Sequence, residues 1–286
     1  MARITSTANP RVRAAARLRG RRERDRQGLT LIDGVRETLR ALAGGARLRE
    51  AFVLPELLAD QEAQALRERL AEERVPIVEL GEDAFAKLAY GDRMDGVVAV
   101  AETPPRSLEA LILPHQPLIC VVEGVEKPGN LGAILRSADG AAVNAVVVAE
   151  SATDLFNPNI IRASIGTIFA VPVAVASSGE VLEWLQRRDI AIVAARVEGS
   201  VDYARADYRG AVAIALGSEA RGLSDPWAEL ARESVKLPML GVADSLNVSA
   251  TAAVLFYEAL RQRTAAARAQ GYSTRRPRMR RPMTRR

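Results

Sequence analysis

Polar residues that could do chemistry follow a hydrophobic run in the middle of the chain. The run "LICVVEGV" leads into "EKPGNLGAILRSADG", which contains Asn130 and Arg136. Apolar residues then recur at i, i+3, i+4 and i+7, which predicts an amphipathic helix over 131–142 with Arg136 off its apolar face. We expect Asn130 to cap this helix and Arg136 to face a cleft. Taken alone, the two residues also fit a purely structural interpretation, in which Asn130 only caps the helix and Arg136 is an ordinary surface arginine.

A second hydrophobic run ends at Leu216 and is followed by a polar loop with two glycines. The stretch "AVAIALGSEARGLSD" places Gly217, Ser218, Glu219 and Gly222 directly after a predicted strand. Glycines let a backbone approach a ligand closely. The spacing matches neither G-x-G-x-x-G nor G-x-x-x-x-G-K-[ST], so it does not indicate a dinucleotide site or a P-loop. In isolation, an ordinary turn from strand to helix is the alternative.

The third stretch, "VKLPMLGVADSLNVSATAAVLFYEAL", holds a strand end, a loop and the start of a long helix. The helix is predicted over 246–263, with Ser245 as its N-cap. Asn247 and Ser249 lie in the first turns, where free backbone N–H groups and the helix dipole favour an anion. A structural role as a helix cap is again the alternative.

The three stretches together are more specific than any one of them. In chain order they read N-x-G-x-I-x-R, L-G-S-E-x-x-G-L-S and L-P-M…S-L-N-V-S. This order resembles the SpoU/TrmH family of RNA ribose 2'-O-methyltransferases, within the SPOUT superfamily. The resemblance covers about residues 118–262, and "LTLIDGVRETLRAL" is similar to the opening of the L30e-like substrate-binding domain of many members. The chain departs from the family in "DGAAVNAV" and at Ser218, where many members have Asn or Ala.

The resemblance implies a fold, a cofactor and a quaternary structure. The expected fold is α/β: a C-terminal SPOUT domain with a mostly parallel sheet and a trefoil knot, and a small N-terminal L30e-like α/β domain. S-adenosylmethionine is expected in the knotted loops of a homodimer. The implied cofactor-binding residues are Leu216, Gly217, Gly222, Leu237, Met239, Leu246 and Asn247. The implied catalytic residues are Asn130, Arg136, Glu219, Ser245 and Asn247.

A 2'-hydroxyl is a weak acid, so methyl transfer needs positioning and help with its proton. Alignment with the methyl donor could supply up to roughly 7–11 kcal/mol, and a general base about 10²–10⁴-fold. Family proposals give the base role to Arg136, but a guanidinium almost never deprotonates. We therefore expect Arg136 to hold a phosphate and stabilise the developing alkoxide, with Asn130 orienting it and Glu219 pairing with it. Ser245 and Asn247 would position the cofactor or the nucleotide.

Composition excludes several other kinds of site. The chain of 286 residues has one histidine, His115, and one cysteine, Cys120, so a histidine-rich metal site and an intrachain disulfide are excluded. An activated sulfonium donor requires no metal. We expect Cys120 to be a buried small residue. There is no apolar run of membrane-spanning length and no secretory signal, so we expect a cytoplasmic protein.

Basic residues gather at the two ends of the chain. The net charge is +5, but residues 1–26 carry +7 and residues 261–286 carry +10, which leaves −12 for the residues between them. Basic ends on an acidic body suggest arms for a polyanion, with solubilising tails as the alternative. The segment 265–286 lacks an apolar period and is expected to be a disordered basic tail.

The elements around these stretches alternate between strand and helix, which is typical of an α/β protein. Residues 29–102 read as strand, helix, strand, helix, strand, helix, strand. The predicted domains are a basic leader 1–26, an RNA substrate-binding domain 27–103, a proline-rich linker 104–117 and a methyltransferase domain 118–264. In the last domain, strands are predicted at 118–123, 145–149, 171–175, 190–195, 211–216 and 234–237. Helices are predicted there at 131–142, 158–168, 179–188 and 246–263.

The predicted function is methyl transfer from S-adenosylmethionine to a ribose 2'-hydroxyl of RNA, with 23S rRNA preferred over tRNA by resemblance. The alternatives are a tRNA 2'-O-methyltransferase and a non-catalytic RNA-binding protein of the same fold. A nucleotide-dependent enzyme of the doubly wound type lacks its glycine fingerprint. Aromatic residues make up 4% of the chain, so extended base-stacking platforms are not expected.

Overall fold

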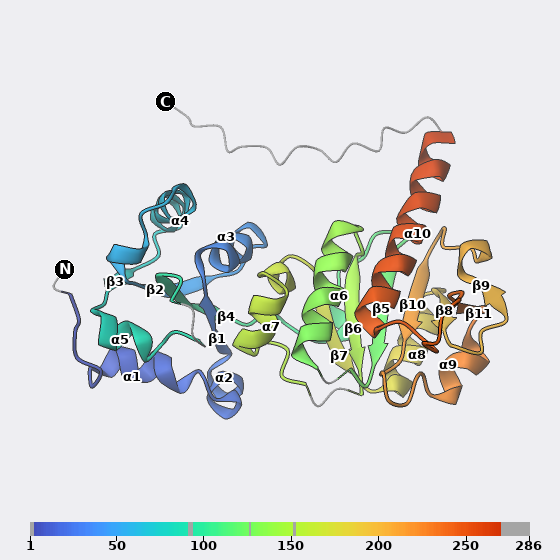
Figure 1. The fold of residues 1–286 in the computed structure, drawn as a ribbon, viewed down its shortest axis with the longest axis horizontal. Coiled ribbons are helices and arrows are strands. Elements are labelled where there is room, and N and C mark those ends of the chain that lie inside the picture. Colours follow the sequence, from blue (N-terminus) through green and yellow to red (C-terminus); the bar gives the residue numbers. More distant parts are fainter. Residues whose placement is uncertain (1–2, 91–93, 126, 151–152, 270–286) are drawn as a thin grey trace.

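The computed structural model describes residues 3–90, 94–125, 127–150 and 153–269. Within them the chain forms two sheets, a four-stranded one with the order β1-β4-β2-β3 and a seven-stranded one with the order β7-β6-β5-β10-β8-β11-β9. Figure 1 shows the two sheets side by side, with the long helix α10 rising from the C-terminal half. We propose that they belong to two domains divided near the predicted linker 104–117.

The N-terminal sheet follows the predicted alternation of strands and helices. Its strands are β1 Leu29–Asp33, β2 Leu48–Val53, β3 Ile77–Glu79 and β4 Val97–Glu102, and its helices are α3 Val35–Ala43, α4 Gln61–Glu72 and α5 Glu82–Ala86. β4 pairs antiparallel with both β1 and β2, whereas β2 and β3 are parallel. The sheet is therefore mixed, because the last strand inserts between the first two.

The basic leader is folded, which differs from an extended arm. It forms α1 Pro10–Arg17 and α2 Arg21–Gln27. Val12, Ala15 and Leu18 are buried in the core beneath β1 and α5. The arginines lie between these apolar positions. The high charge of the segment therefore drew attention away from an amphipathic helix with one apolar face.

The C-terminal sheet is entirely parallel among the described residues. Its strands are β5 Leu118–Glu123, β6 Ala145–Ala149, β7 Val173–Ala176, β8 Ala191–Ala195, β9 Val201–Asp202, β10 Val212–Leu216 and β11 Glu233–Lys236. Its helices are α6 Pro128–Gly140, α7 Pro158–Ala163, α8 Ser178–Arg187, α9 Asp225–Leu230 and α10 Val248–Ala269. The predicted α/β class and mostly parallel sheet are confirmed, and the trefoil knot stays a prediction.

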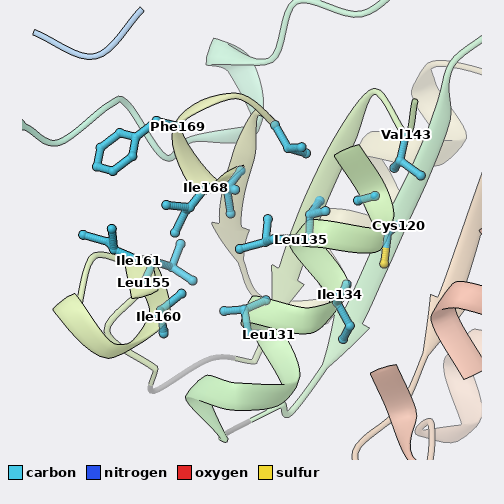
Figure 2. Close-up of a cluster of buried hydrophobic side chains, with 14 of the residues drawn as sticks. Cys120, Leu131, Ile134, Leu135, Val143, Leu155, Ile160, Ile161, Ile168 and Phe169 are labelled. Carbon is cyan, nitrogen blue, oxygen red and sulfur yellow. The ribbon is translucent and has the colours of Figure 1, made fainter. Parts of the chain in front are cut away.

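Both faces of this sheet are covered, as its uniformly apolar strands require. Cys120 and Val122 face the side covered by α6 and α10, whereas Ile119 and Val121 face the side covered by α8 and α9. Figure 2 shows Leu131, Ile134 and Leu135 of α6 packed toward the sheet and toward the segment around α7. The thiol of Cys120 is fully buried, which confirms the prediction of a buried small residue and raises the pKa of the thiol.

The two sheets are joined by packing and by polar contacts. The core cluster on the α6 side continues into the N-terminal half through Ile32 and Ala41. The Thr30 hydroxyl donates to the Phe156 carbonyl at 2.7 Å. Arg24, almost fully buried, pairs with Asp154 from the other half of the chain. This seam therefore holds α2 against the loop that precedes α7.

Several element boundaries differ from the prediction. The predicted helix 158–168 ends at Ala163 and continues as a separate 3₁₀ turn, Thr167–Phe169, because Ile165 and Gly166 adopt positive φ. Strand β9 and helix α9 were not predicted, since two and six residues are too short for a periodic pattern. α10 runs through Ala269, so residues 265–269 are helical, while the predicted disorder of 270–286 lies outside the described residues.

The described residues hold neither a membrane span nor a metal cluster. None of the helices there is long and apolar enough to cross a membrane. In the same part of the chain, no group of three or more His, Cys, Asp or Glu side chains is placed to hold a metal ion.

Candidate active site

The candidate site lies at the carboxyl ends of β5 and β10, neighbouring strands of the parallel sheet. From β5 the chain proceeds outward through β6 and β7 on one side, and then returns to build β8 on the far side of β10. Such a reversal of strand order leaves a crevice where ligands bind. A cavity of about 610 Å³ occurs there. Its walls include Glu123, Gly124, Lys127, Asn130, Ser178, Ser218, Glu219, Gly222, Ser224 and Val248.

The three polar stretches of the sequence converge at this cavity. Asn247, from the start of α10, donates through Nδ2 to Asn130 Oδ1 of α6 at 3.1 Å. The same amide group donates to the carboxylate of Glu219 in the loop after β10. One amide therefore links all three strand-end loops, although the residues lie 117 and 28 positions apart in the sequence.

Lys127 completes this network and was not singled out by the sequence analysis. Its Nζ lies 2.9 Å from Glu219 Oε2. The hydrogen bond from Lys127, together with those of Asn130 and Asn247, holds the pKa of Glu219 below its usual value. Glu219 is therefore ionised at neutral pH and is a poor general base. The sequence signal that could have identified Lys127 was a cationic side chain directly before Pro128, a few residues before the helix predicted from residue 131.

Two capping predictions were wrong. α6 begins at Pro128 with Lys127 as its N-cap, because proline suits the first helical position and lacks the N–H that would be left unpaired there. Asn130 lies one turn inside, so its side chain is free for Asn247. α10 begins at Val248, and Asn247 rather than Ser245 receives the hydrogen bonds of the first turn, from Ser249 N at 2.9 Å and Ser249 Oγ at 2.6 Å.

The loop after β10 is tightly folded on itself. Gly222 N donates to the Ser218 carbonyl at 2.9 Å, and Gly222 has a φ of +66°. A Cβ at Gly217 would lie 1.9 Å from the Gly222 carbonyl carbon. Both glycines are therefore required by the turn, one for close backbone approach and one for left-handed backbone.

A buried carboxylate, Glu123, forms part of the cavity wall, and the sequence analysis did not identify it as a site residue. Its Oε1 accepts from Ser178 Oγ at 2.6 Å, Ser224 Oγ at 2.8 Å and Trp227 Nε1 at 2.9 Å. Its Oε2 accepts from Ser224 N at 2.7 Å. Burial alone would raise the pKa of Glu123, but these hydrogen bonds outweigh it and the pKa lies below its usual value. Glu123 therefore joins the end of β5 to the starts of α8 and α9.

Arg136 lies on the exposed side of α6, which confirms its position off the apolar stripe. It does not line the cavity. The expected ion pair between Arg136 and Glu219 is not formed in the part of the chain that the structure describes, and Glu219 pairs with Lys127 instead. Among the described residues Arg136 has no ion pair, so its guanidinium is available to a ligand approaching α6.

The remaining predicted residues do not line the cavity. Leu216 is buried at the end of β10, and Leu237 is half-buried against the core just after β11. Met239 is also half-buried, whereas Leu246 is 40% exposed. Ser245 is exposed at the end of the loop that leads into α10. Of the predicted cofactor-binding residues, Gly222 lines the cavity and Asn247 belongs to its polar network.

Comparisons with known proteins agree with this architecture. A family model described as SpoU rRNA Methylase family matches residues 117–257, and one described as MRM3-like substrate binding domain matches residues 9–99. The chain is 33% identical over 273 residues to the 23S rRNA (uridine(2479)-2'-O)-methyltransferase of Streptomyces viridochromogenes, covering 91% of this chain and 92% of that relative.

Solved structures are similar over nearly the same extent. A crystal structure described as RNA 2'-O ribose methyltransferase superposes with a TM-score of 0.80 at 44% identity, covering 91% of this chain and 99% of that one. The SpoU methyltransferase AviRb from Streptomyces viridochromogenes, in complex with the cofactor AdoMet, has a TM-score of 0.80 at 31% identity, with coverages of 90% and 99%. This chain therefore belongs to the SpoU rRNA methylase family.

Proposed function

We propose that this protein transfers a methyl group from S-adenosylmethionine to a ribose 2'-hydroxyl of 23S rRNA. The observation that carries the proposal is the convergence of Asn130, Glu219 and Asn247 from three separate strand ends on one cavity. Family membership and the named activity of the Streptomyces viridochromogenes relative give the reaction and the RNA.

The residues around the cavity fit the cofactor. A volume of about 610 Å³ lies within the range of small-molecule pockets. A Cβ at Gly222 would meet no atom within 4 Å, so this glycine leaves backbone open toward a ligand. We propose that Gly217, Gly222, Leu237 and Leu246 hold the cofactor mainly through backbone and apolar contacts. When bound, S-adenosylmethionine supplies a methyl group already activated on sulfur.

The polar residues then act on the RNA. Arg136 binds a phosphate next to the target ribose and stabilises negative charge on the 2'-oxygen as its proton leaves. Asn130 and Asn247 orient the nucleotide from the two helix starts, and Ser245 assists from the adjoining loop. Glu219 holds Lys127 and Asn247 in place, since a carboxylate with a lowered pKa accepts hydrogen bonds and does not remove protons efficiently.

The test is methyl transfer from labelled S-adenosylmethionine to 23S rRNA, with mapping of 2'-O-methyl positions. Arg136→Ala is expected to lower kcat by about 10²-fold or more, as removal of one charge-stabilising donor does elsewhere. Arg67→Ala, on the exposed side of α4, is the matched control and should be unaffected. A normal rate in Arg136→Ala removes the assigned role. Methylation of tRNA alone corrects the substrate, and cofactor binding without transfer to any RNA supports a non-catalytic RNA-binding protein.

We also propose a homodimer in the cytoplasm. The loop before α10 exposes Leu240 and Val242 completely, and Tyr257 of α10 is 53% exposed. We infer that these apolar side chains belong to one contact surface around α10, since a contiguous exposed apolar patch is typical of a protein interface. Light scattering coupled to size-exclusion chromatography should give twice the monomer mass, and Val242→Asp should shift the protein toward monomer.

A further inference from the structure

A second cavity lies at the seam between the two halves of the chain, outside the site described above. Its volume is about 460 Å³. Its lining includes Arg19, Arg21, Arg24, Pro128, Asp154 and Asn157. We call it the seam groove. Arg24 is neutralised by its pair with Asp154, and Arg21 lies 3.5 Å from Asp25, which is also 3.6 Å from Arg106. With Arg19 and Arg106 counted, four arginines stand against two carboxylates, so the groove carries an excess of positive charge that nothing in the catalytic chemistry uses.

The seam groove adjoins the catalytic cavity. Pro128, which lines the groove, directly follows Lys127, which lines the cavity, and consecutive Cα atoms are about 3.8 Å apart. In Figure 1, α1 and α2 run along the lower edge of the N-terminal half, and α10 starts in the lower part of the C-terminal half, above α8 and α9. A chain whose ribose enters the cavity can therefore continue into the groove without crossing the molecule.

Two arginines of the groove, Arg19 and Arg24, are held in place before any ligand arrives. The guanidinium of Arg19 stacks over the Tyr90 ring at 5.0 Å, and its Nη1 donates to the Lys87 carbonyl at 3.3 Å. Arg24 donates to the carbonyls of Leu18 and Arg19, each at 2.7 Å. The contacts of Arg24 are therefore internal and fix the turn that carries Arg19. Because Arg19 is already ordered, binding an anion there costs less conformational entropy.

We propose that the seam groove binds the backbone phosphates of the single-stranded RNA that adjoins the target nucleotide; the inference rests on the proposed function. Arginine forks match phosphate geometry, and contiguity with a ribose site makes the same strand the natural occupant. No aromatic side chain lines the groove among the described residues, so it reads backbone and not base stacking. Arg13 and Arg17, exposed one turn apart on α1, extend the basic surface beyond it.

The test compares two double variants of the full-length protein that lose the same charge. Arg19→Gln/Arg21→Gln removes two groove arginines. Arg36→Gln/Arg67→Gln removes two exposed arginines of α3 and α4, which lie along the opposite edge in Figure 1. The probe is a fluorescein-labelled oligouridylate of about 12 nucleotides, and its Kd is measured by anisotropy between about 50 and 200 mM salt.

The groove variant should raise the Kd about tenfold at the lowest salt and lower the slope of log Kd against log salt by about 1.4, or about 0.7 for each phosphate that the variant no longer neutralises. The control should change neither by more than about a third of these amounts. Calorimetric affinity for S-adenosylmethionine should be equal in all proteins. Arg21→Gln alone leaves the Arg19 stack intact and should give about half the change in slope, which keeps the test valid if the double variant unfolds.

Equal effects in the two double variants, or no binding of the probe by the unaltered protein, overturn the inference. Its failure is distinguishable from failure of the proposed function. Methylation of 23S rRNA with equal salt slopes in both variants refutes the groove alone. Absence of methyl transfer with different salt slopes refutes the enzyme and leaves the groove as an RNA-binding surface.

Discussion

Replacing Glu123 with glutamine should weaken both the fold and the catalytic cavity. The carboxylate lies at 8% exposure and accepts four hydrogen bonds. Three of these reach Oε1, which glutamine retains as an acceptor. The fourth joins Oε2 to Ser224 N, where glutamine would place an NH₂ group. In Glu123→Gln the new NH₂ group therefore faces the Ser224 N–H, so two hydrogen-bond donors meet in a site that is almost closed to water.

The magnitude follows from that one hydrogen bond and from the removed charge. Leaving a buried donor unpaired costs about 1–3 kcal/mol, and the three retained bonds weaken because their acceptor is no longer ionised. For a chain of this size, about 1 kcal/mol corresponds to roughly 2–4 °C in the unfolding temperature. We expect Glu123→Gln to unfold about 4–10 °C below the unaltered protein near pH 7.

The loss of stability should depend on pH with a definite sign. The pKa of Glu123 is lowered in the folded protein, so its carboxylate adds stability above the unfolded pKa of about 4.3. That stability is lost as the pH falls through the folded value. The difference between Glu123→Gln and the unaltered protein should therefore be fully present near pH 7 and shrink below about pH 4.

The assay is differential scanning calorimetry across this pH range, with the exposed Glu62→Gln on α4 as control. Methyl transfer should also fall, because Ser224 ends the loop that begins at Gly217, and a displacement of about 1 Å near a reacting centre can cost about 10²-fold. An unfolding temperature within about 1 °C of the unaltered protein at neutral pH would refute the assignment of Glu123 as the support of this loop.

Three further substitutions test other parts of the structure. Gly217→Ala should lower the unfolding temperature and abolish S-adenosylmethionine binding, because the added Cβ would lie 1.9 Å from the Gly222 backbone. The control is Gly179→Ala in α8, where no atom lies within 4 Å of the added carbon. It should leave cofactor binding unchanged and should either not change the free energy of unfolding or raise it by up to about 1 kcal/mol. Asn247→Ala should cost about 1 kcal/mol because the N-cap is removed, and should lower kcat more than cofactor affinity, measured by calorimetry and single-turnover kinetics. Burial raises the pKa of Asp33 to about 6, so stability should fall as pH rises from about 4 to 7, and Asp33→Asn should remove that slope in pH-dependent unfolding.

The parallel sheet was predictable because its strands are apolar on both faces and end in polar loops. β5, β6 and β10 were located within one residue of their observed bounds, and the apolar stripe of α6 placed Arg136 outside the core. Periodicity is a local property, and these elements are long enough to express it. β9, with two residues, is defined only by pairing with β11 and leaves no pattern in the sequence.

Long-range hydrogen bonds set the details that sequence reasoning missed. Asn247, and not the predicted Ser245, is the N-cap of α10. Its side chain accepts a hydrogen bond from Ser249 N and also donates to Asn130 of α6, which lies 117 positions away in the sequence. Glu123 ended an apolar run and its partners lie up to 104 positions away, so nothing nearby marked it as a hub. The leader was predicted as an arm because its charge hid the buried positions Val12 and Ala15.

The polar groups of the site are of two kinds: buried groups that fix the shape of the loop after β10, and exposed groups whose partners RNA can displace. Lys127 and Glu219 form an exposed pair, and such pairs are worth only about 0.2–1 kcal/mol, so an incoming phosphate can take Lys127 from Glu219 at little cost. The loop does not depend on that pair for its shape, because Glu123, Trp227 and the contact between Gly217 and Gly222 hold it from within. Rigid buried contacts beneath easily exchanged surface contacts allow RNA to enter without remodelling the cavity. This is the arrangement that positioning catalysis requires, since the geometry is set before the substrate arrives.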